Sequence, residues 1–451
     1  MKDAITSPET RSMTINRSTF LKGTVATAAT VAASGVVTDA ALAKGKMAAP
    51  WVKRSPSGEA LIWAALPFST EQVAAFNKVY PDVKITQKVM TGGAPSLQTH
   101  LITGIGVPDG IHFIDDGALG QYAPVLYDVS RYLEPYLHKI APYKLAVSRQ
   151  AGRFVAIPWD VDPAFLIYRT DLVARAGVDV GAIHTYDDLI VAARQVQAKI
   201  PSCQKPLAFI DGPSFFTWGT EAMAWQQHTG IVDAKGNIQL KSQAYTNIFN
   251  YYEKAYKAGV TNLLLWQTPS LYDAWNNGKT CFLHYADWFT HWNQPGLQAS
   301  WGKYGLAKLP VFNKSDSPWA NAGGSGYVVP LKAKRPDLGA LFGIFQLFDR
   351  RALSQAASGR VYEAVLPAAS DLWPYVNYKR PIINPSINEH ALLVEAARNI
   401  PTTYRYPSYF DRTFPYYGAK IHQVLTGKMS AREAQDSTYN DVMNNVVKRA
   451  Y

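Results

Sequence analysis

Short strand-like runs alternate with amphipathic helical segments along this chain of 451 residues, and this alternation restricts the fold more than any other feature. In the N-terminal part, strand-like runs at 59–65, 83–86 and 111–114 are separated by helical segments at 70–80 and around 97–101. Such alternation predicts a sheet covered by helices. In sheets of this kind, ligands bind beyond the carboxyl ends of the strands. The loops expected at that edge are 66–69, 91–93 and 115–117.

The segment 151–171 joins two buried strands through residues that are poorly suited to stabilising a core. Apolar runs at 154–157 and 164–168 predict the strands, and a helix is expected to open at Asp171. The residues of interest between the runs are Trp159, Asp160 and Asp162. The two aspartates are two positions apart, so they point to the same side of an extended chain.

This pairing of aromatic and acidic residues favours binding of a hydroxyl-rich ring. Carboxylates accept hydrogen bonds from hydroxyl groups, and an indole covers the C–H face of the ring. Alternatively, the aspartates cap the next helix or pair with surface arginines.

The alternation continues to the C-terminus, with strands expected at 206–210, 280–285, 304–307 and 327–330. The helical segments expected after residue 171 are 186–198, 242–257, 270–276, 336–349, 389–397, 416–425 and 430–446. The strand 206–210 is expected to end in residues 211–218. Asp287 and Trp288 end the strand 280–285, and the glycine-rich stretch 322–326 precedes the strand 327–330.

Composition limits the classes of function that fit. The length favours two or three domains, and 47 % hydrophobic residues are typical of a globular protein. The formal charge is +11, but the basic residues are scattered, without the clustered stripe of a nucleic-acid binder. Twelve tryptophans and 26 tyrosines favour a ligand that contains rings. Cys203 and Cys281 have neither a CxxC motif nor zinc-ligand spacing, and they form one disulfide after export or remain two buried thiols.

Residues 1–43 have the organisation of an export signal. Positive charges precede a mildly apolar run at 23–37, and the small residues at 41–43 fit a cleavage site. The stretch 16–22 is similar to the twin-arginine export motif, although Ser18 stands in place of the second arginine. We expect cleavage before Lys44 and release into a periplasm. A lipid anchor is not expected, because no cysteine lies near the cleavage site. No segment is long and apolar enough for a transmembrane helix of the mature chain.

A series of short motifs runs through nearly the whole mature chain. They are Tyr-Pro-Asp-Val-Lys-Ile at 80–85, Pro-Asp-Gly-Ile at 108–111, Gly-Gln-Tyr-Ala at 120–123, Gly-Arg-Phe-Val-Ala-Ile-Pro at 152–158, Leu-Ile-Tyr-Arg at 166–169, Thr-Tyr-Asp-Asp-Leu at 185–189, Gly-Lys-Thr at 278–280 and Gly-Lys-Met-Ser at 427–430. Each motif alone is weak. Their order and spacing resemble the extracellular solute-binding proteins of ABC importers, in the carbohydrate-binding group that includes maltose-binding protein.

The resemblance implies an α/β fold of two lobes, the type II periplasmic-binding-protein fold. The lobes are joined by three hinge crossovers, and the ligand cleft lies between them. Lobe one would comprise residues 50–163 and 328–366, and lobe two residues 164–322 and 372–451.

The resemblance also implies ligand-binding positions. Asp162 matches a ligand-binding acid beside the first crossover, and Trp288 matches a stacking tryptophan. Phe414 matches another stacking aromatic residue, with Tyr416 and Tyr417 as rivals. Together with polar residues at the strand ends and in the glycine-rich loops, the predicted ligand-binding residues are Thr91, Asp116, Trp159, Asp160, Asp162, Asp211, Phe215, Phe216, Asp287, Trp288, Gly324, Ser325, Phe414 and Tyr417. For each aromatic residue, a place in the core of a lobe is the alternative.

The function implied is capture of a sugar or oligosaccharide and its delivery to the membrane permease subunits of an ABC importer. The protein would act as a monomer in the periplasm, without catalysis, cofactor or metal. Two alternatives remain open. A secreted glycosidase would use Asp160 with Asp162, or Asp115 with Asp116, since paired carboxylates suit that chemistry. The same fold could instead hold a non-sugar ligand, namely a polyamine, or ferric iron at the tyrosine pair 416–417.

Overall fold

The computed structural model describes residue 49 and residues 51–52, 55–90, 93–357, 366–376 and 379–448. The predicted leader 1–43 and Thr91 lie outside these residues. Residues 39–451 form one compact unit. Within the described ranges, no helix is both long and apolar enough to cross a bilayer.

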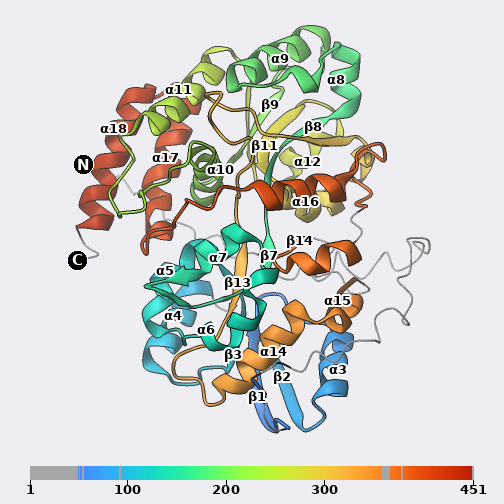
Figure 1. Ribbon diagram of the computed structural model, residues 1–451. Coiled ribbons are helices and arrows are strands. Elements are labelled where there is room, and N and C mark those ends of the chain that lie inside the picture. Colours follow the sequence, from blue (N-terminus) through green and yellow to red (C-terminus); the bar gives the residue numbers. More distant parts are fainter. Residues whose placement is uncertain are drawn as a thin grey trace, which may run out of the picture. The chain divides into compact units, whose positions relative to one another are not determined.

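Two five-stranded sheets, each with its own helices, make up the compact unit (Figure 1). The first sheet has the order β2 (Val83–Val89), β1 (Gly58–Ala64), β3 (Gly110–Asp115), β13 (Ser325–Val328) and β6 (Ile157–Pro158). Strand β1 pairs in parallel with β2 and β3, whereas β13 runs antiparallel to β3 and β6. The chain therefore returns to this sheet after building the second one. We call the first sheet with its helices lobe one.

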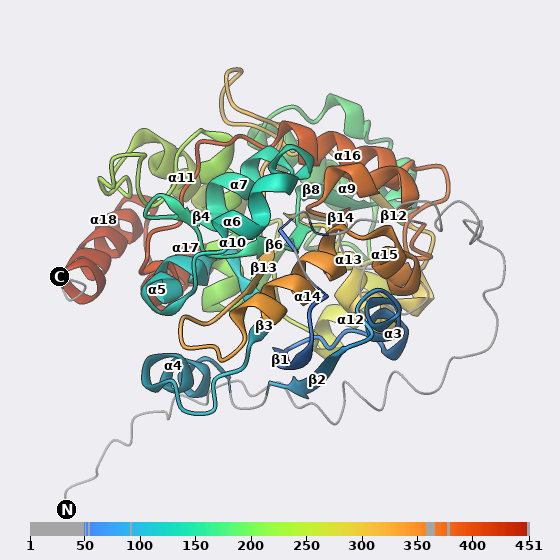
Figure 2. The ribbon, with the colours of Figure 1, turned by 60° about the horizontal axis from the view of Figure 1, so that its bottom comes forward.

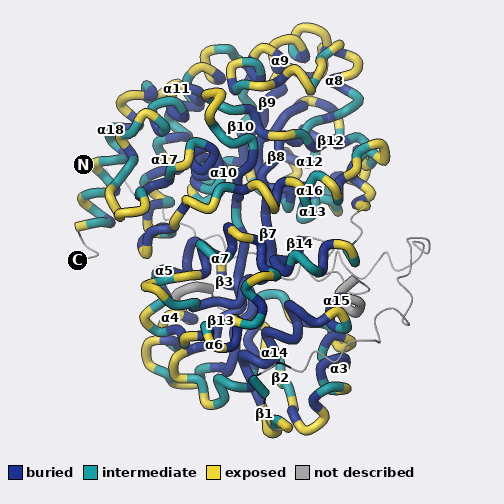
Figure 3. Tube along the Cα trace, in the orientation of Figure 1, coloured by how far each residue is buried: buried dark blue, intermediate teal, exposed yellow. Residues whose placement is uncertain are grey.

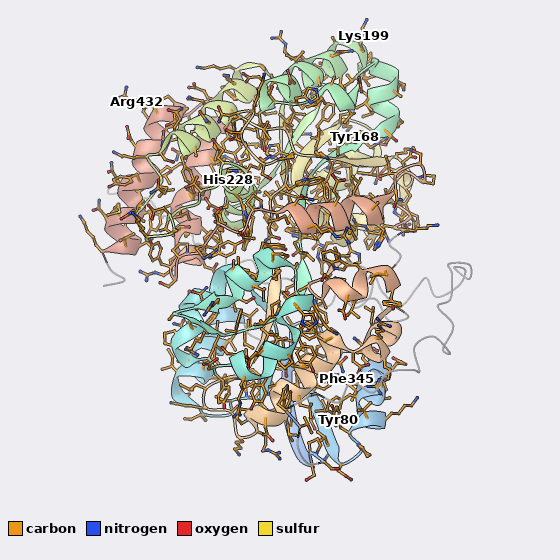
Figure 4. The ribbon with its side chains drawn as sticks, in the orientation of Figure 1. Tyr80, Tyr168, Lys199, His228, Phe345 and Arg432 are labelled. Atoms are coloured by element: carbon orange, nitrogen blue, oxygen red, sulfur yellow. The ribbon has the colours of Figure 1, made fainter. Side chains whose placement is uncertain are left out.

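Helix α14 (Pro336–Phe348) packs on β1 and β3 of lobe one (Figure 2). All its residues from Leu338 to Phe348 are buried (Figure 3), as expected for a helix that is apolar all round. Gly339 allows the close approach, since a Cβ there would lie 1.9 Å from the carbonyl oxygen of Asp109. Phe345 packs against Tyr80, which ends α3 (Thr70–Val79), with ring centroids 6.3 Å apart (Figure 4).

The second sheet has the order β10 (Thr261–Leu265), β9 (Leu207–Asp211), β11 (Phe282–Ala286), β8 (Ala164–Arg169) and β12 (Tyr304–Ala307). Strand β9 pairs in parallel with β10 and β11, and β8 lies antiparallel between β11 and β12. We call this sheet with its helices lobe two. Its helices include α8 (Thr170–Ala176), α9 (Tyr186–Lys199), α10 (Pro213–Gln226), α11 (Gln243–Lys257), α12 (Pro269–Asn276), α16 (Glu389–Asn399), α17 (Phe414–Leu425) and α18 (Ala431–Val442).

The chain passes between the two lobes three times. The passages lie between β6 and β8, between β12 and β13, and between α15 (Arg350–Ala357) and α16. Strand β7 (Asp160–Val161) of the first passage pairs antiparallel with β14 (Leu366–Pro367) of the third. The three crossovers implied by the resemblance are therefore present, and the first and third are held together by backbone hydrogen bonds.

Most predicted elements are present within a few residues, but the sequence analysis left out one helix and one strand. Helix α10 was not predicted; it takes up most of 211–218, since it begins at Pro213, whose fixed φ suits the first helical turn. The strand β10 was not predicted at all. In addition, the single strand expected at 154–157 is divided into β5 (Arg153–Phe154) and β6. Of the two possibilities for the cysteines, the structure shows buried free thiols at Cys203 and Cys281.

Candidate functional site

A buried ion pair lies where the first two crossovers meet lobe one. The ammonium of Lys144, on α7 (Pro142–Ser148), lies 2.5 Å from Asp116 Oδ2 and 3.8 Å from Asp160 Oδ1. The same ammonium donates to the carbonyl oxygen of Ser325 at 3.0 Å. All three charged side chains are fully buried. Lys144 therefore connects the end of β3, the first crossover and the second crossover.

Asp160 and Asp162 both face the second crossover, in agreement with their spacing of two residues. Asp160 accepts from the amide of Ser325 at 2.6 Å and from its hydroxyl at 3.0 Å. Asp162 Oδ2 accepts from the amide of Gly324 at 2.6 Å. Two of the predicted acids thus hold two of the predicted loop residues, and both oxygens of Asp160 are engaged within the fold.

Asn321 and Tyr143 complete this junction, and neither was predicted from the sequence. The Tyr143 hydroxyl donates to Asn321 Oδ1 at 2.8 Å, and the amide of Asp162 donates to the same oxygen at 3.3 Å. Asn321 Nδ2 donates to the carbonyl oxygen of Gly323 at 2.6 Å. No local sequence signal marks either residue, because their partners are distant along the chain.

Several buried carboxylate oxygens at this junction have no hydrogen-bond partner among the described residues. They are Asp116 Oδ1, Asp162 Oδ1 and both oxygens of Asp287. Asp287 Oδ2 lies 3.6 Å from the guanidinium of Arg380, at ion-pair distance. A buried acceptor without a hydrogen bond is costly, so these oxygens suit a hydroxyl-bearing ligand.

Burial changes the acidity of these groups. It raises the pKa of Asp162 well above its ordinary value, and the charges of Asp160 and Asp287 raise it further. Burial also raises the pKa of Asp160 to about 6 and that of Asp287 to about 7, while Lys144 and Arg380 respectively oppose these increases. The pKa values of Asp160 and Asp287 therefore lie closer to neutral pH than that of an ordinary aspartate.

Three half-buried aromatic rings lie beyond the carboxyl ends of neighbouring strands of lobe two. Phe215 follows β9, Trp266 follows β10, and Trp288 follows β11. The rings of Phe215 and Trp266 are stacked with centroids 5.1 Å apart, and Trp266 meets Trp288 edge to face at 5.4 Å. Sequence reasoning missed Trp266 because it missed β10. We call these three residues the aromatic platform.

The aromatic platform reaches the crossover junction through Trp288. Its indole Nε1 donates to the carbonyl oxygen of Ala322 at 2.8 Å. Gly323 lies between the platform and the acids, since a Cβ there would be 2.9 Å from Trp288 Nε1 and 3.1 Å from Asp162 Oδ2. Aromatic faces and a buried carboxylate are therefore brought together at one place.

A second aromatic group lies where η1 (Asp116–Ala118) of lobe one meets lobe two. Phe410 packs against Trp218 and Phe414, with ring centroids at 5.0 and 5.2 Å. Phe410 is buried, whereas Trp218 and Phe414 are half-buried. A Cβ on Gly117 would lie 2.4 Å from Phe410 and 3.1 Å from Trp218, so the two lobes touch here.

Three of the predicted aromatic residues lie in packed interiors, where their faces are covered by protein. Trp159 packs against His112 and Phe68 in lobe one, with centroids at 4.1 and 5.4 Å. Phe216 and Tyr417 belong to the core of lobe two. Their position matches the alternative stated for each aromatic residue, a place in the core.

Tyr417 also takes part in a buried hydrogen-bond group around Glu221. Its hydroxyl donates to this carboxylate at 3.1 Å, and the hydroxyls of Tyr245 and Tyr404 donate at 2.7 and 2.5 Å. In the part of the chain that the structure describes, no group of three or more His, Cys, Asp and Glu residues could hold a metal ion. The carboxylate of Asp211, at the end of β9, lies 3.1 Å from Nδ1 of His422 on α17.

A family profile and individual relatives both match this chain. The family profile described as bacterial extracellular solute-binding protein matches residues 64–348. The chain is 24 % identical over 297 residues to an arabinooligosaccharide-binding protein of Halalkalibacterium halodurans, a match that covers 62 % of this chain and 64 % of that relative. The match thus spans slightly less than two thirds of the relative's length.

Solved structures share the fold along most of their length. A structure of an extracellular solute-binding protein of family 1 superposes with a TM-score of 0.71 at 18 % identity, covering 86 % of this chain and 99 % of that one. The binding protein of B. animalis subsp. lactis Bl-04, in complex with beta-1,6-galactobiose, gives a TM-score of 0.69 at 17 % identity, covering 88 % and 99 %. At these identities the likeness concerns the fold, and it confirms the predicted two-lobed α/β class.

Proposed function

Because this chain belongs to the bacterial extracellular solute-binding proteins, we propose that it captures a sugar or oligosaccharide and delivers it to the permease subunits of an ABC importer. The observation that supports this proposal is the meeting of the aromatic platform with the crossover acids around Gly323. One side of the site offers ring faces, and the other offers buried acceptors. A sugar presents the complementary groups, namely a C–H face and hydroxyl donors.

The proposed ligand-binding residues are those with free surface or free acceptors at the junction. Phe215, Trp266 and Trp288 would stack on the sugar, and Trp218 and Phe414 would extend the contact to a longer ligand. Asp116 Oδ1, Asp162 Oδ1 and the two oxygens of Asp287 accept no hydrogen bond among the described residues and would accept from its hydroxyls. Asp160, Gly324 and Ser325 would set the geometry, since they are bonded to one another or to Asp162. A site with buried acceptors discriminates strongly against a ligand that lacks the matching hydroxyl.

The related proteins suggest where to begin the search for the sugar. One relative is named for arabino-oligosaccharides, and one structural neighbour holds a galactobiose. We therefore propose an oligosaccharide of pentoses or hexoses, bound by a monomer in the periplasm after removal of residues 1–43. No catalytic step is part of this proposal.

A thermal-shift screen of the exported protein against such oligosaccharides tests the proposal. A ligand at 100 times its dissociation constant adds roughly 2.7 kcal/mol to the free energy of unfolding. Titration calorimetry of each hit then gives the affinity. Stabilisation by spermidine or ferric iron, with none by any sugar, would contradict the proposed ligand class and favour the non-sugar alternatives.

The glycosidase hypothesis is tested in the same samples by assaying release of reducing ends. Its aspartate pairs are partly engaged within the fold, because Asp160 holds Ser325 and Asp116 is paired with Lys144. We expect the hit sugar to be recovered intact after prolonged incubation. Steady release of reducing ends, lost on Asp162→Asn, would instead favour the glycosidase.

A further inference from the structure

A cavity of about 880 Å³ opens on lobe one, and none of the predicted ligand-binding residues lines it. Its walls come from the segment 126–134, from the hairpin of β4 (Arg149–Gln150) and β5, and from Leu331 after β13. Helix α6 (Ser130–Leu133) packs against β5 of this hairpin. Three arginines line this space: Arg131, Arg149 and Arg153. We call it the arginine cavity.

Arg131 is fixed by aromatic neighbours and not by an acid. Its Nη2 donates to the hydroxyl of Tyr127 at 3.2 Å and also to the hydroxyl of Tyr132. Its guanidinium lies over the ring of Tyr132, 4.4 Å from the centroid. These contacts hold the cation in place without neutralising its charge.

The other two arginines are fixed by backbone carbonyl groups. Arg149 Nε donates to the carbonyl oxygen of Gly152 at 3.1 Å. Arg153 donates from Nη1 to Leu126 at 2.9 Å and from Nη2 to Ala123 at 2.6 Å. Carbonyl partners orient a guanidinium but leave its full positive charge.

Within the described residues, none of the three arginines forms an ion pair with a carboxylate. Two acids also line the cavity, Asp128 and Glu134. Asp128 accepts from the backbone amide of Ser130 at 2.9 Å and interacts electrostatically with Arg153 from beyond ion-pair distance, and both acids are exposed. The lining therefore has an excess of positive charge that is already held in position.

We propose that the arginine cavity is a second binding site, for a phosphate-bearing anion with an apolar portion. Guanidinium groups match phosphate oxygens with two parallel hydrogen bonds, and groups fixed in advance lose little freedom on binding. The volume is in the range of small-molecule sites. Tyr127, Leu137 and Phe154 offer apolar surface beside the arginines. The phosphate belongs either to a free small molecule or to the headgroup of an anionic phospholipid.

The test uses the exported protein with phenyl phosphate, inorganic phosphate and lipid vesicles. Titration calorimetry is expected to show tighter binding of phenyl phosphate than of inorganic phosphate, and weaker binding of both as salt is added. The double variant Arg131→Gln/Arg149→Gln is expected to lose about tenfold or more in affinity, because charge-assisted bonds are removed. Arg153 is left unchanged because it holds two backbone carbonyls. Arg149→Gln alone, at an exposed position, should weaken binding in the same direction.

Arg194→Gln is the matched control, since Arg194 is exposed on α9 of lobe two. It should leave phosphate binding unchanged, and the double variant should bind sugar normally. Flotation with phosphatidylglycerol vesicles, absent with phosphatidylcholine and lost in the double variant, would assign the site to a lipid headgroup. Binding of phenyl phosphate without flotation would assign it to a free ligand. If neither phenyl phosphate nor the phosphatidylglycerol vesicles bind, the arginine cavity is not an anion site. The same conclusion follows if the double variant and Arg149→Gln bind these probes as tightly as the unmodified protein does.

Discussion

Replacing Gly324 by alanine measures how closely the second crossover packs against the ion pair of lobe one. Gly324 has a φ of 92°, in the left-handed region, and its amide donates to Asp162. A Cβ at this position would lie 2.6 Å from Asp116 Oδ2 and 3.0 Å from Lys144 Nζ. Since both side chains are fully buried, the added methyl group must displace the ion pair or the crossover.

The expected loss of stability has two parts. An alanine in left-handed backbone costs about 1–2 kcal/mol. Losing a buried ion-pair interaction costs about 3–5 kcal/mol, but Lys144 would keep its bond to Ser325, so only part of this is lost. We expect Gly324→Ala to lower the free energy of unfolding by about 3–5 kcal/mol in all.

Gly236→Ala is the matched control, because Gly236 has a φ of 84° and open space around its would-be Cβ. It carries the backbone strain alone, so its expected loss is about 1–2 kcal/mol. Urea unfolding of both variants, followed by circular dichroism, measures the difference. Equal losses in the two variants would refute the close packing of Gly324 against the buried pair.

Three further predictions concern the site. Trp266→Ala should weaken sugar binding by about 1–3 kcal/mol in calorimetry, whereas Trp301→Ala, at an exposed position, should leave it unchanged. If the two variants bind the sugar with equal affinity, Trp266 does not contact the ligand. Asp162→Asn should weaken sugar binding about tenfold and leave the melting temperature of the empty protein nearly unchanged, because Asp162 Oδ1 has no partner among the described residues and an asparagine oxygen can still accept from the Gly324 amide; a much lower melting temperature would make Asp162 a structural acid. The free energy of unfolding of the empty protein should fall as the pH rises from about 4 to 7. The reason is that the raised pKa values of Asp160 and Asp287 let the folded state bind more protons than the unfolded chain; a pH profile of stability that Asp287→Asn does not flatten would argue against this.

The local pattern of the sequence was sufficient for most of the fold. Alternating strands and helices reflect burial periodicity, which short windows record directly. The spacing of Asp160 and Asp162 also predicted correctly that both side chains face one side. The helix α10 was missed because its first turn, with Gly212 and Pro213, has the same composition as a loop.

The site was less predictable because its geometry depends on distant partners. Lys144 is 28 residues from Asp116 along the chain, and Asn321 is 178 residues from Tyr143. No local pattern indicates that such residues meet. Trp159 shows the same dependence: Asp160 and Asp162 follow it in sequence, but its ring packs against Phe68 and His112 from distant parts of the chain. Burial of this kind is set by tertiary packing and not by the sequence nearby.

The contact of Gly117 with Trp218 has an optical consequence. Trp218 is half-buried on α10, and part of its cover comes from the other lobe. The emission wavelength of an indole depends on how much water surrounds it, so any change in the separation of the lobes alters the fluorescence of this one side chain. The chain has twelve tryptophans, but subtracting the spectrum of Trp218→Phe isolates the contribution of Trp218. Trp218 is therefore an intrinsic reporter of any change in the separation of the lobes, and it needs no attached dye.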